Sequence, residues 1–167
     1  PLEGLMMGTR CGDVDPAAVP FIMEKEDLSP QEMDDVMNNE SGFVGVSGIS
    51  SDTRDIEEAA ENGNERAQLA LDMFTYRVKK YIGSYAAAMN GVDAIVFTAG
   101  IGENAIKIRE DICADLDYLG IELDTEKNDV RGQAQEISAD EADVNIFTIP
   151  TNEELVIARD TKQLVTE

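Results

Sequence analysis

One long helical segment, residues 64–89, constrains the fold of this chain more than any other part of the sequence. Its apolar residues recur at steps of three and four, the period of one face of an α-helix. They are Ala67, Leu71, Phe74, Val78, Tyr81, Ile82 and Tyr85. At 1.5 Å per residue such a helix would span roughly 39 Å. We therefore expect a central core helix or an interface helix, whose aromatic side chains serve packing rather than holding a cofactor.

The remaining sequence predicts shorter helices interspersed with strands. Further helices are expected over residues 16–26, 30–39, 55–62, 104–119 and 151–164. Ser29-Pro30-Gln31-Glu32 has the pattern of a capping box with proline at the first helical position. Strands are expected over 92–98, 120–123 and 144–149, because these stretches are short and apolar. Residues 41–54 are expected to form a loop with a helical turn, and 124–143 a solvated loop.

A glycine motif, FTAGIGEN at residues 97–104, separates an expected strand from an expected helix. Strand, glycine turn and helix together point main-chain N–H groups at one place, where a phosphate could approach the backbone closely. Gly100–Ala105 also matches the Gly-x-Gly-x-x-Gly/Ala dinucleotide fingerprint, with Glu122 at roughly the 20-residue offset of a ribose-binding acid. A third interpretation is a turn that uses glycine only to change direction. The motif alone leaves all three open.

The net charge of the chain limits the kinds of partner that it can bind. There are 13 Lys and Arg against 35 Asp and Glu, a formal net charge of −22, which repels nucleic acid and anionic lipid. We expect a solvated acidic surface, no nucleic-acid partner and no membrane, since no apolar stretch approaches about 18 residues. An anionic substrate would need local arginines and a cation. The opening Pro1-Leu2-Glu3, without an initiator methionine or a leader, suggests a cut chain.

The few cysteines and the absence of histidine limit the catalytic and metal-binding chemistry that this chain can carry out. The two cysteines, Cys11 and Cys113, are far apart and lack CxxC spacing, which favours reduced thiols and a cytoplasmic location. Histidine is absent, so nucleophile systems that depend on histidine are excluded within this chain and a zinc site is disfavoured.

Four motifs, taken in order, resemble a known family. They are GTRCGDVDP at 8–16, SGISSDTRD at 47–55, FTAGIGEN at 97–104 and IPTNEELVIARD at 149–160. Their order and spacing closely resemble the carboxy-terminal part of acetate kinase over essentially all 167 residues. The resemblance implies a partial, helix-rich α/β fold: a ribonuclease H-like domain of the sugar kinase, actin and Hsp70 superfamily. It also implies that residues 1–167 are the nucleotide-binding part and that an amino-terminal domain is absent.

The resemblance implies a role for each matching residue. The nucleotide phosphates would be held by Gly100, Ile101, Gly102, Glu103 and Asn104. The ribose and adenine side would be contacted by Asp52, Thr53 and Arg54. Arg10 would stabilise the transferring phosphoryl group, a task suited to a guanidinium that can fork two hydrogen bonds. Glu153 would bind Mg²⁺, or Mn²⁺ in its place.

The implied activity is reversible, in-line transfer of the ATP γ-phosphoryl group to acetate, giving acetyl phosphate and ADP, in a cytoplasmic homodimer. The missing part would supply the other metal, acetate and catalytic groups, including histidines. We therefore expect the isolated chain to bind nucleotide at most weakly and to lack turnover. A propionate kinase of the same family remains an alternative. An NAD-binding oxidoreductase domain and a noncatalytic dimerisation module built on residues 64–89 are alternatives of other classes.

Overall fold

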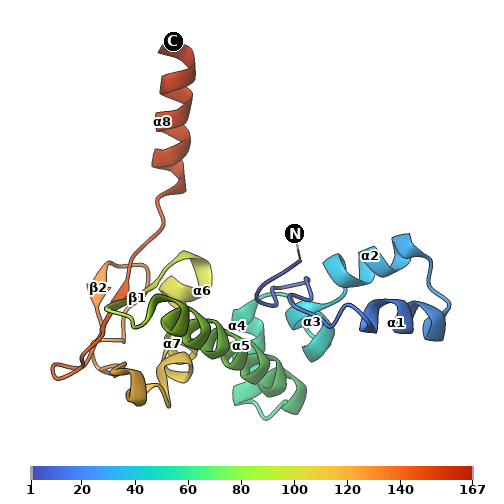
Figure 1. Ribbon diagram of the computed structural model, residues 1–167, viewed down its shortest axis with the longest axis horizontal. Coiled ribbons are helices and arrows are strands. Elements are labelled where there is room, and N and C mark those ends of the chain that lie inside the picture. The colour runs from blue at the N-terminus through green and yellow to red at the C-terminus, as the bar shows by residue number, and fades with distance from the viewer. Residues whose placement is uncertain (1, 167) are drawn as a thin grey trace. The chain divides into compact units, whose positions relative to one another are not determined.

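The computed structural model describes residues 2–166, and the chain divides into two compact units, Pro1–Tyr85 and Ala86–Glu167 (Figure 1). The first unit is helical. Its elements are α1 (Ala18–Glu26), α2 (Pro30–Asn39), α3 (Gly42–Ser47), α4 (Thr53–Glu61) and most of α5 (Glu65–Met89). The helices expected over 16–26, 30–39, 55–62 and 64–89 are thus confirmed, and α3 is the helical turn expected within 41–54.

The capping box at the start of α2 forms as the sequence predicts. The Ser29 hydroxyl accepts a hydrogen bond from the Glu32 N–H at 3.3 Å, and the Glu32 carboxylate accepts one from the Ser29 N–H at 2.8 Å. Two N–H groups that the helix cannot pair are thereby satisfied. The helix therefore begins at Pro30, the residue that the capping-box pattern predicts.

The core of the first unit is built on the amino-terminal half of α5. Ala67, Leu71 and Phe74 of the apolar stripe are buried. The ring of Phe74 packs on that of Phe43 in α3, with centroids 5.3 Å apart. Tyr85, at the far end of the stripe, is 60% exposed. Packing therefore accounts for the first half of the stripe, as expected, and not for all of it.

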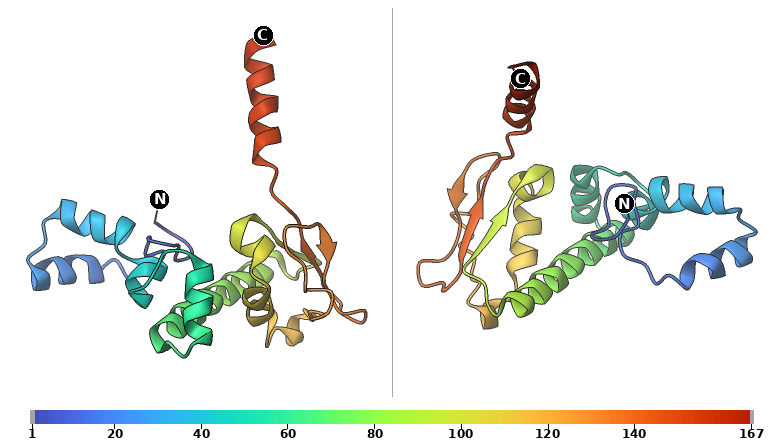
Figure 2. Two further views of the ribbon diagram at one scale, coloured as in Figure 1. Left: turned by 180° about the vertical axis from the view of Figure 1, so that it is seen from behind. Right: turned by 45° about the horizontal axis from the view of Figure 1, so that its top comes forward.

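The second unit contains a small mixed sheet (Figure 2). Its elements are β1 (Ala94–Phe97), α6 (Ala99–Asn104), α7 (Ile106–Cys113), a 3-10 turn (Asp117–Leu119), β2 (Gln135–Glu136), β3 (Asn145–Thr148) and α8 (Glu153–Thr166). The strand order is β1-β3-β2, with β1 and β3 parallel and β2 antiparallel to β3. The strands expected over 92–98 and 144–149 are confirmed.

The two faces of this sheet differ in burial. Phe97 pairs with Thr148 and both are buried, as is Ile146, which lies two residues before Thr148 on the same strand and therefore on the same face. Buried Ile108 and Ile112 lie on α7, which runs beside the sheet (Figure 2). Neighbouring residues along a strand point to opposite faces, and the opposite face, which carries Ala94, Val96 and Asn145, is exposed. The core of this unit therefore lies on one side of the sheet.

The sequence-based predictions of two elements are wrong. The helix expected over 104–119 is interrupted at Ala105, whose backbone (φ −91°, ψ 86°) is not helical, so that α6 and α7 are separate. The strand expected over 120–123 does not form, because Gly120 adopts a left-handed conformation (φ 77°) that ends the 3-10 turn. Only an isolated bridge between Leu123 and Ser138 remains.

The solvated loop expected over 124–143 is also only partly correct. It contains β2 and two buried polar residues, Asn128 and Ser138. Among the described residues, no helix combines the length and the apolar character needed to cross a membrane.

Candidate functional site

Arg10 lies in a short loop that hydrogen bonds fasten at both ends. Asp13 is the main fastening: its Oδ1 accepts from the Gly4 N–H at 2.7 Å, and its Oδ2 accepts from the Tyr81 hydroxyl at 2.5 Å and from Arg77 Nη1 at 3.0 Å on α5. The hydrogen bond from Tyr81, followed by that from Gly4, lowers the pKa of the Asp13 carboxyl. The loop is therefore tied to the long helix through an ionised carboxylate.

The start of α3 holds the same loop from the other side. The Phe43 N–H donates to the Met7 carbonyl at 2.8 Å. Gly42 has a φ of 64°, and a Cβ there would lie 2.1 Å from the Met7 oxygen, so only glycine permits this approach. Arg10 itself is exposed, and in residues 2–166 its guanidinium makes no hydrogen bond or ion pair with another side chain. A rigid loop thus presents an available guanidinium.

Asp52, Thr53 and Arg54 form the start of α4. Asp52 is the N-cap residue, accepting from the Arg54 N–H at 2.9 Å. The Arg54 guanidinium forks onto the same carboxylate, at 3.0 Å from Nε and 2.5 Å from Nη2. This side chain is nevertheless 84% exposed. The three residues therefore form one polar group at the helix start, with the arginine facing solvent.

The carboxyl group of Asp52 should stay ionised in acid. The Arg54 side chain, and after it the Arg54 N–H, lower the pKa of Asp52 from 3.8 to about 2. Because the folded-state pKa is the lower one, the stabilisation is present above the unfolded pKa and is lost as the pH falls through the folded pKa. In carbon-13 NMR at about pH 3, Asp52 should give a carboxylate signal. The Arg54→Ala variant should shift this signal towards the protonated form, and a protonated Asp52 in the parent chain would contradict the assignment.

The two glycines of FTAGIGEN lie inside α6 rather than in a loop, which corrects the expected turn geometry. The left-handed residue is Ala99, with a φ of 58°. A Cβ on Gly102 would lie 3.1 Å from the Phe97 carbonyl carbon, so this glycine lets α6 pack on the end of β1. A Cβ on Gly100 would meet no described atom within 4 Å. The surface of α6 at Gly100 is thus not covered by another part of the described chain.

The segment that leads into α8 is hydrogen bonded directly to α6. Thr151 Oγ1 accepts from the Ala99 N–H at 3.1 Å and lies 2.8 Å from Thr98 Oγ1. The Thr151 N–H donates to Glu103 Oε1 at 2.7 Å. Two residues further on, Glu153 opens α8 and is exposed. The structure therefore joins the predicted phosphate-binding segment to Thr151, two residues before the predicted metal-binding glutamate.

Asn152 caps α8, since its Oδ1 accepts from the Leu155 N–H at 3.0 Å. Of the two polar residues that precede the helix, Thr151 and Asn152, it is therefore Asn152 that fills the capping role. Residues 2–166 contain no cluster of three or more His, Cys, Asp or Glu placed to share a metal ion. A cation at Glu153 would therefore need oxygen ligands from outside this group of side chains.

Sequence reasoning missed Arg109, which is fully buried on α7. Its Nε donates to Asn128 Oδ1 at 2.7 Å, its Nη1 to the Gly102 carbonyl at 3.0 Å, and its Nη2 to the carbonyls of Asn128 and Val130 at 2.8 Å each. Desolvation, followed by the charge of Arg131, lowers the pKa of Arg109. The sequence does contain a sign of its burial, because Arg109 lies on the same face of the helix as Ile108 and Ile112. Arg109 thereby fastens α6 to residues 128–130.

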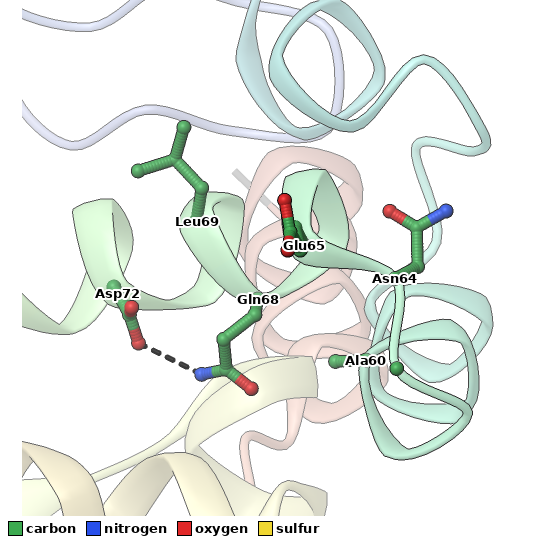
Figure 3. A pocket seen from close by; sticks show the side chains of 7 residues that line it. Ala60, Asn64, Glu65, Gln68, Leu69 and Asp72 are labelled. Carbon is green, nitrogen blue, oxygen red and sulfur yellow. Dashed lines mark hydrogen bonds between the residues drawn. The ribbon is translucent and has the colours of Figure 1, made fainter.

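A hollow of about 460 Å³ lies between the end of α4 and the start of α5 (Figure 3). Its lining includes Ala60, Glu65 and Leu69, and Gln68 Nε2 donates to Asp72 Oδ1 there at 2.8 Å. None of the residues predicted from the sequence lines it. This hollow is therefore not part of the candidate site that the sequence predicts.

The predicted residues fall into two groups, one in each unit. Arg10 and Asp52–Arg54 belong to the first unit, and Gly100–Asn104 and Glu153 to the second. Within the second group, direct hydrogen bonds join the α6 segment to the residues that precede Glu153. The second group is therefore the part of the candidate site whose geometry is defined.

Comparison with known proteins identifies the relatives of this chain. The model of the acetokinase family matches residues 1–159. Acetate kinase from Moorella thermoacetica is 65% identical over 165 residues, which are 99% of this chain and 42% of that protein. Among solved structures, Porphyromonas gingivalis acetate kinase matches with a TM-score of 0.93 and 51% identity, over 98% of this chain and 41% of that one. A propionate kinase from Francisella tularensis matches with a TM-score of 0.86 and 40% identity, over 94% and 40%.

The chain therefore spans about two fifths of the length of these relatives. The match covers the first three sequence motifs and all but the last residue of the fourth. It favours the kinase interpretation of Gly100–Ala105 over the dinucleotide-binding one. The helix-rich fold with a small mixed sheet agrees with that of the matched region of the solved kinases. On these grounds, the chain belongs to the acetokinase family.

Proposed function

We propose that this chain is the carboxy-terminal, nucleotide-binding part of an acetate kinase, with the ribonuclease H-like fold of the sugar kinase, actin and Hsp70 superfamily. The whole enzyme transfers the γ-phosphoryl group of ATP to acetate, reversibly, giving acetyl phosphate and ADP. The observation that carries this proposal is the hydrogen-bonded junction between α6 and Thr151, because it joins the segment that contains Gly100 to the chain two residues before Glu153.

The nucleotide would lie with its phosphates along Gly100–Asn104. The open space at Gly100 gives a bulky anion access to the main chain, while Gly102 is occupied with packing against β1. The Glu103 side chain is engaged by Thr151, so its contribution is to hold the segment in place. Asp52, Thr53 and Arg54 would serve the ribose and adenine end, where the exposed guanidinium of Arg54 offers hydrogen bonds and a flat surface for stacking.

Glu153 suits a magnesium ion that is held mostly by phosphate oxygens and water. Mg²⁺ keeps several waters and takes one or two carboxylates beside phosphates, so a single exposed carboxylate on this side is sufficient, and Mn²⁺ could replace it. When bound, the cation would neutralise phosphate oxygens. The contribution of this chain is one exposed carboxylate at the start of α8.

Arg10 would stabilise charge on the phosphoryl group in transit. Phosphoryl transfer needs positioning and charge neutralisation more than covalent chemistry. The Arg10 guanidinium has no side-chain partner among residues 2–166 and is carried by a loop that Asp13 and Gly42 hold, so it offers both charge and a held position within its own unit. Direct in-line transfer between ATP and acetate requires no phosphoenzyme.

Two further proposals concern the acid that accepts the phosphoryl group and the oligomeric state of the enzyme. The similarity to a solved propionate kinase supports propionate as a second candidate acceptor, and the acceptor pocket would lie mostly in the part of the enzyme outside this chain. We further propose a cytoplasmic homodimer. Light scattering on the chain at high concentration tests the dimer, and a monomer there would count against it.

The experiment that tests the proposed function uses a fusion protein, in which the amino-terminal part of the Moorella thermoacetica relative precedes residues 1–167. With ATP and Mg²⁺, the fusion protein should form acetyl phosphate from acetate, trapped as the hydroxamate, whereas the 167-residue chain alone should not. Propionate in place of acetate compares the two acceptors. A fusion protein with a native helical spectrum and no turnover on either acid would overturn the proposal, as would full activity of the chain alone.

A further inference from the structure

We propose that Thr151 and Glu103 form a latch that fixes the metal-binding glutamate relative to the nucleotide phosphates. In this role both are positioning residues: they contact neither the phosphoryl group nor the metal, and they act through Glu153. The inference rests on the proposed function, and it assigns to the same site two residues that set its affinity for the cation.

Packing does not hold Glu153 in place. It is the first residue of α8, and none of the described residues of that helix, 153–166, is buried. The chain that reaches it is held as far as Ile149, whose N–H donates to the Phe97 carbonyl at 2.9 Å and extends the pairing of β1 with β3. Beyond that point the side chain of Glu153 depends on whatever fixes residues 150–152.

The latch supplies that fixation by hydrogen bonds on two sides of Thr151. Its hydroxyl accepts from the Ala99 N–H and meets the Thr98 hydroxyl, while its N–H donates to the Glu103 carboxylate. These partners lie at the start and near the end of α6. The position and the direction of the chain at Thr151 are therefore both defined relative to α6.

The α6 segment is itself firmly held, so it can serve as the reference. The buried Arg109 binds the Gly102 carbonyl, the Gly132 N–H donates to the Glu103 carbonyl at 3.1 Å, and Arg131 donates to the Asn104 carbonyl. The latch thus joins an otherwise unburied helix to a fixed one. A metal held jointly by Glu153 and by phosphates on α6 requires such a defined separation.

The latch predicts a specific effect on metal affinity. In the fusion protein, Thr151→Val keeps the shape of the side chain and removes its hydroxyl. With ADP present, the dissociation constant for Mn²⁺, followed by electron paramagnetic resonance, should rise about tenfold. Thr151→Ser should restore it to within about twofold of the parent value. The melting temperature and the KM for acetate should stay near the parent values, because Ala99 is exposed and water can replace the lost partner.

A second measurement uses the 167-residue chain itself and needs no metal. Hydrogen exchange followed by mass spectrometry should show faster exchange over residues 149–155 in Thr151→Val than in the parent chain or in Thr151→Ser. Exchange in α7 should be unchanged. Equal exchange over 149–155 in all three proteins would overturn the latch.

Glu153→Gln in the fusion protein separates failure of the latch from failure of the proposed function. If Glu153→Gln weakens Mn²⁺ binding and Thr151→Val does not, the latch is wrong and the metal site stands. If Glu153→Gln leaves Mn²⁺ binding unchanged, the assignment of Glu153 is wrong and the latch has no functional role. If both Glu153→Gln and Thr151→Val weaken Mn²⁺ binding and Thr151→Ser restores it, the result supports the latch and the metal site together.

Discussion

Replacing Arg10 with alanine lowers the kcat of the fusion protein by about 10³- to 10⁵-fold, the range by which an arginine on the transition state accelerates phosphoryl transfer. The reason is the placement of the guanidinium: a loop fastened by Asp13 and closed against Gly42 holds Arg10 exposed. The dissociation constant for ADP should change little, because Arg10 is assigned to the phosphoryl group in transit. Steady-state kinetics of acetyl phosphate formation, together with ADP titration, measure both effects.

Two variants control this experiment. Arg10→Lys keeps the charge but loses the two-pronged geometry, and should recover only part of the activity. Arg159→Ala removes an exposed arginine from α8 and should leave kcat within about twofold, as expected of a surface substitution away from the site. If Arg10→Ala retained more than a tenth of the parent kcat, the role given to this arginine would be wrong.

Replacing Arg109 with methionine should lower the free energy of unfolding of the second unit by about 3 kcal/mol or more. The guanidinium is fully buried and donates to the carbonyls of Gly102, Asn128 and Val130. Methionine fills similar space without donors. Asn128 Oδ1 and the Val130 carbonyl, both buried, and the half-buried Gly102 carbonyl would then lose this donor. Each buried group left unsatisfied costs about 1–3 kcal/mol. Urea denaturation of the 167-residue chain, followed by circular dichroism, measures the loss.

The matched control lies on the same helix. Lys107 is largely exposed and pairs with Asp111 at 2.7 Å, so Lys107→Met should change the free energy of unfolding by no more than about 0.5 kcal/mol. Equal stability of the Arg109→Met and Lys107→Met variants would show that the buried hydrogen bonds of Arg109 add nothing net to folding.

The sequence predicted those elements whose causes are local. The start of α2 follows from Ser29 and Glu32 within four residues, and α5 from a repeat sustained over many turns. Two glycines within six residues disfavour a helix by propensity, yet α6 forms. Gly102 serves its packing, since a Cβ there would crowd the Phe97 carbonyl carbon. The break at Ala105 and the failed strand at 120–123 likewise depend on tertiary packing that periodicity does not show.

The candidate site divides in the same way. Residue chemistry and motif order led to Arg10, Asp52–Arg54, Gly100–Asn104 and Glu153, whose roles stay predictions. The contacts of Thr151 were not predicted, because its partners Thr98, Ala99 and Glu103 lie about fifty positions earlier in the sequence. Arg109 was missed because its carbonyl partners come from a stretch taken for a solvated loop.

The exposed face of the small sheet bears on how the chain behaves in solution. Val96 is 49% exposed there, and β1 is an outer strand of the described sheet, so copies that approach one another could pair along the free edge of β1. Mutual repulsion opposes such encounters, since each copy carries a formal charge of −22. That repulsion reaches only about 10 Å in 0.1 M salt and fades as carboxylates take up protons near pH 4. Concentrated stocks should accordingly keep best in dilute, neutral buffers.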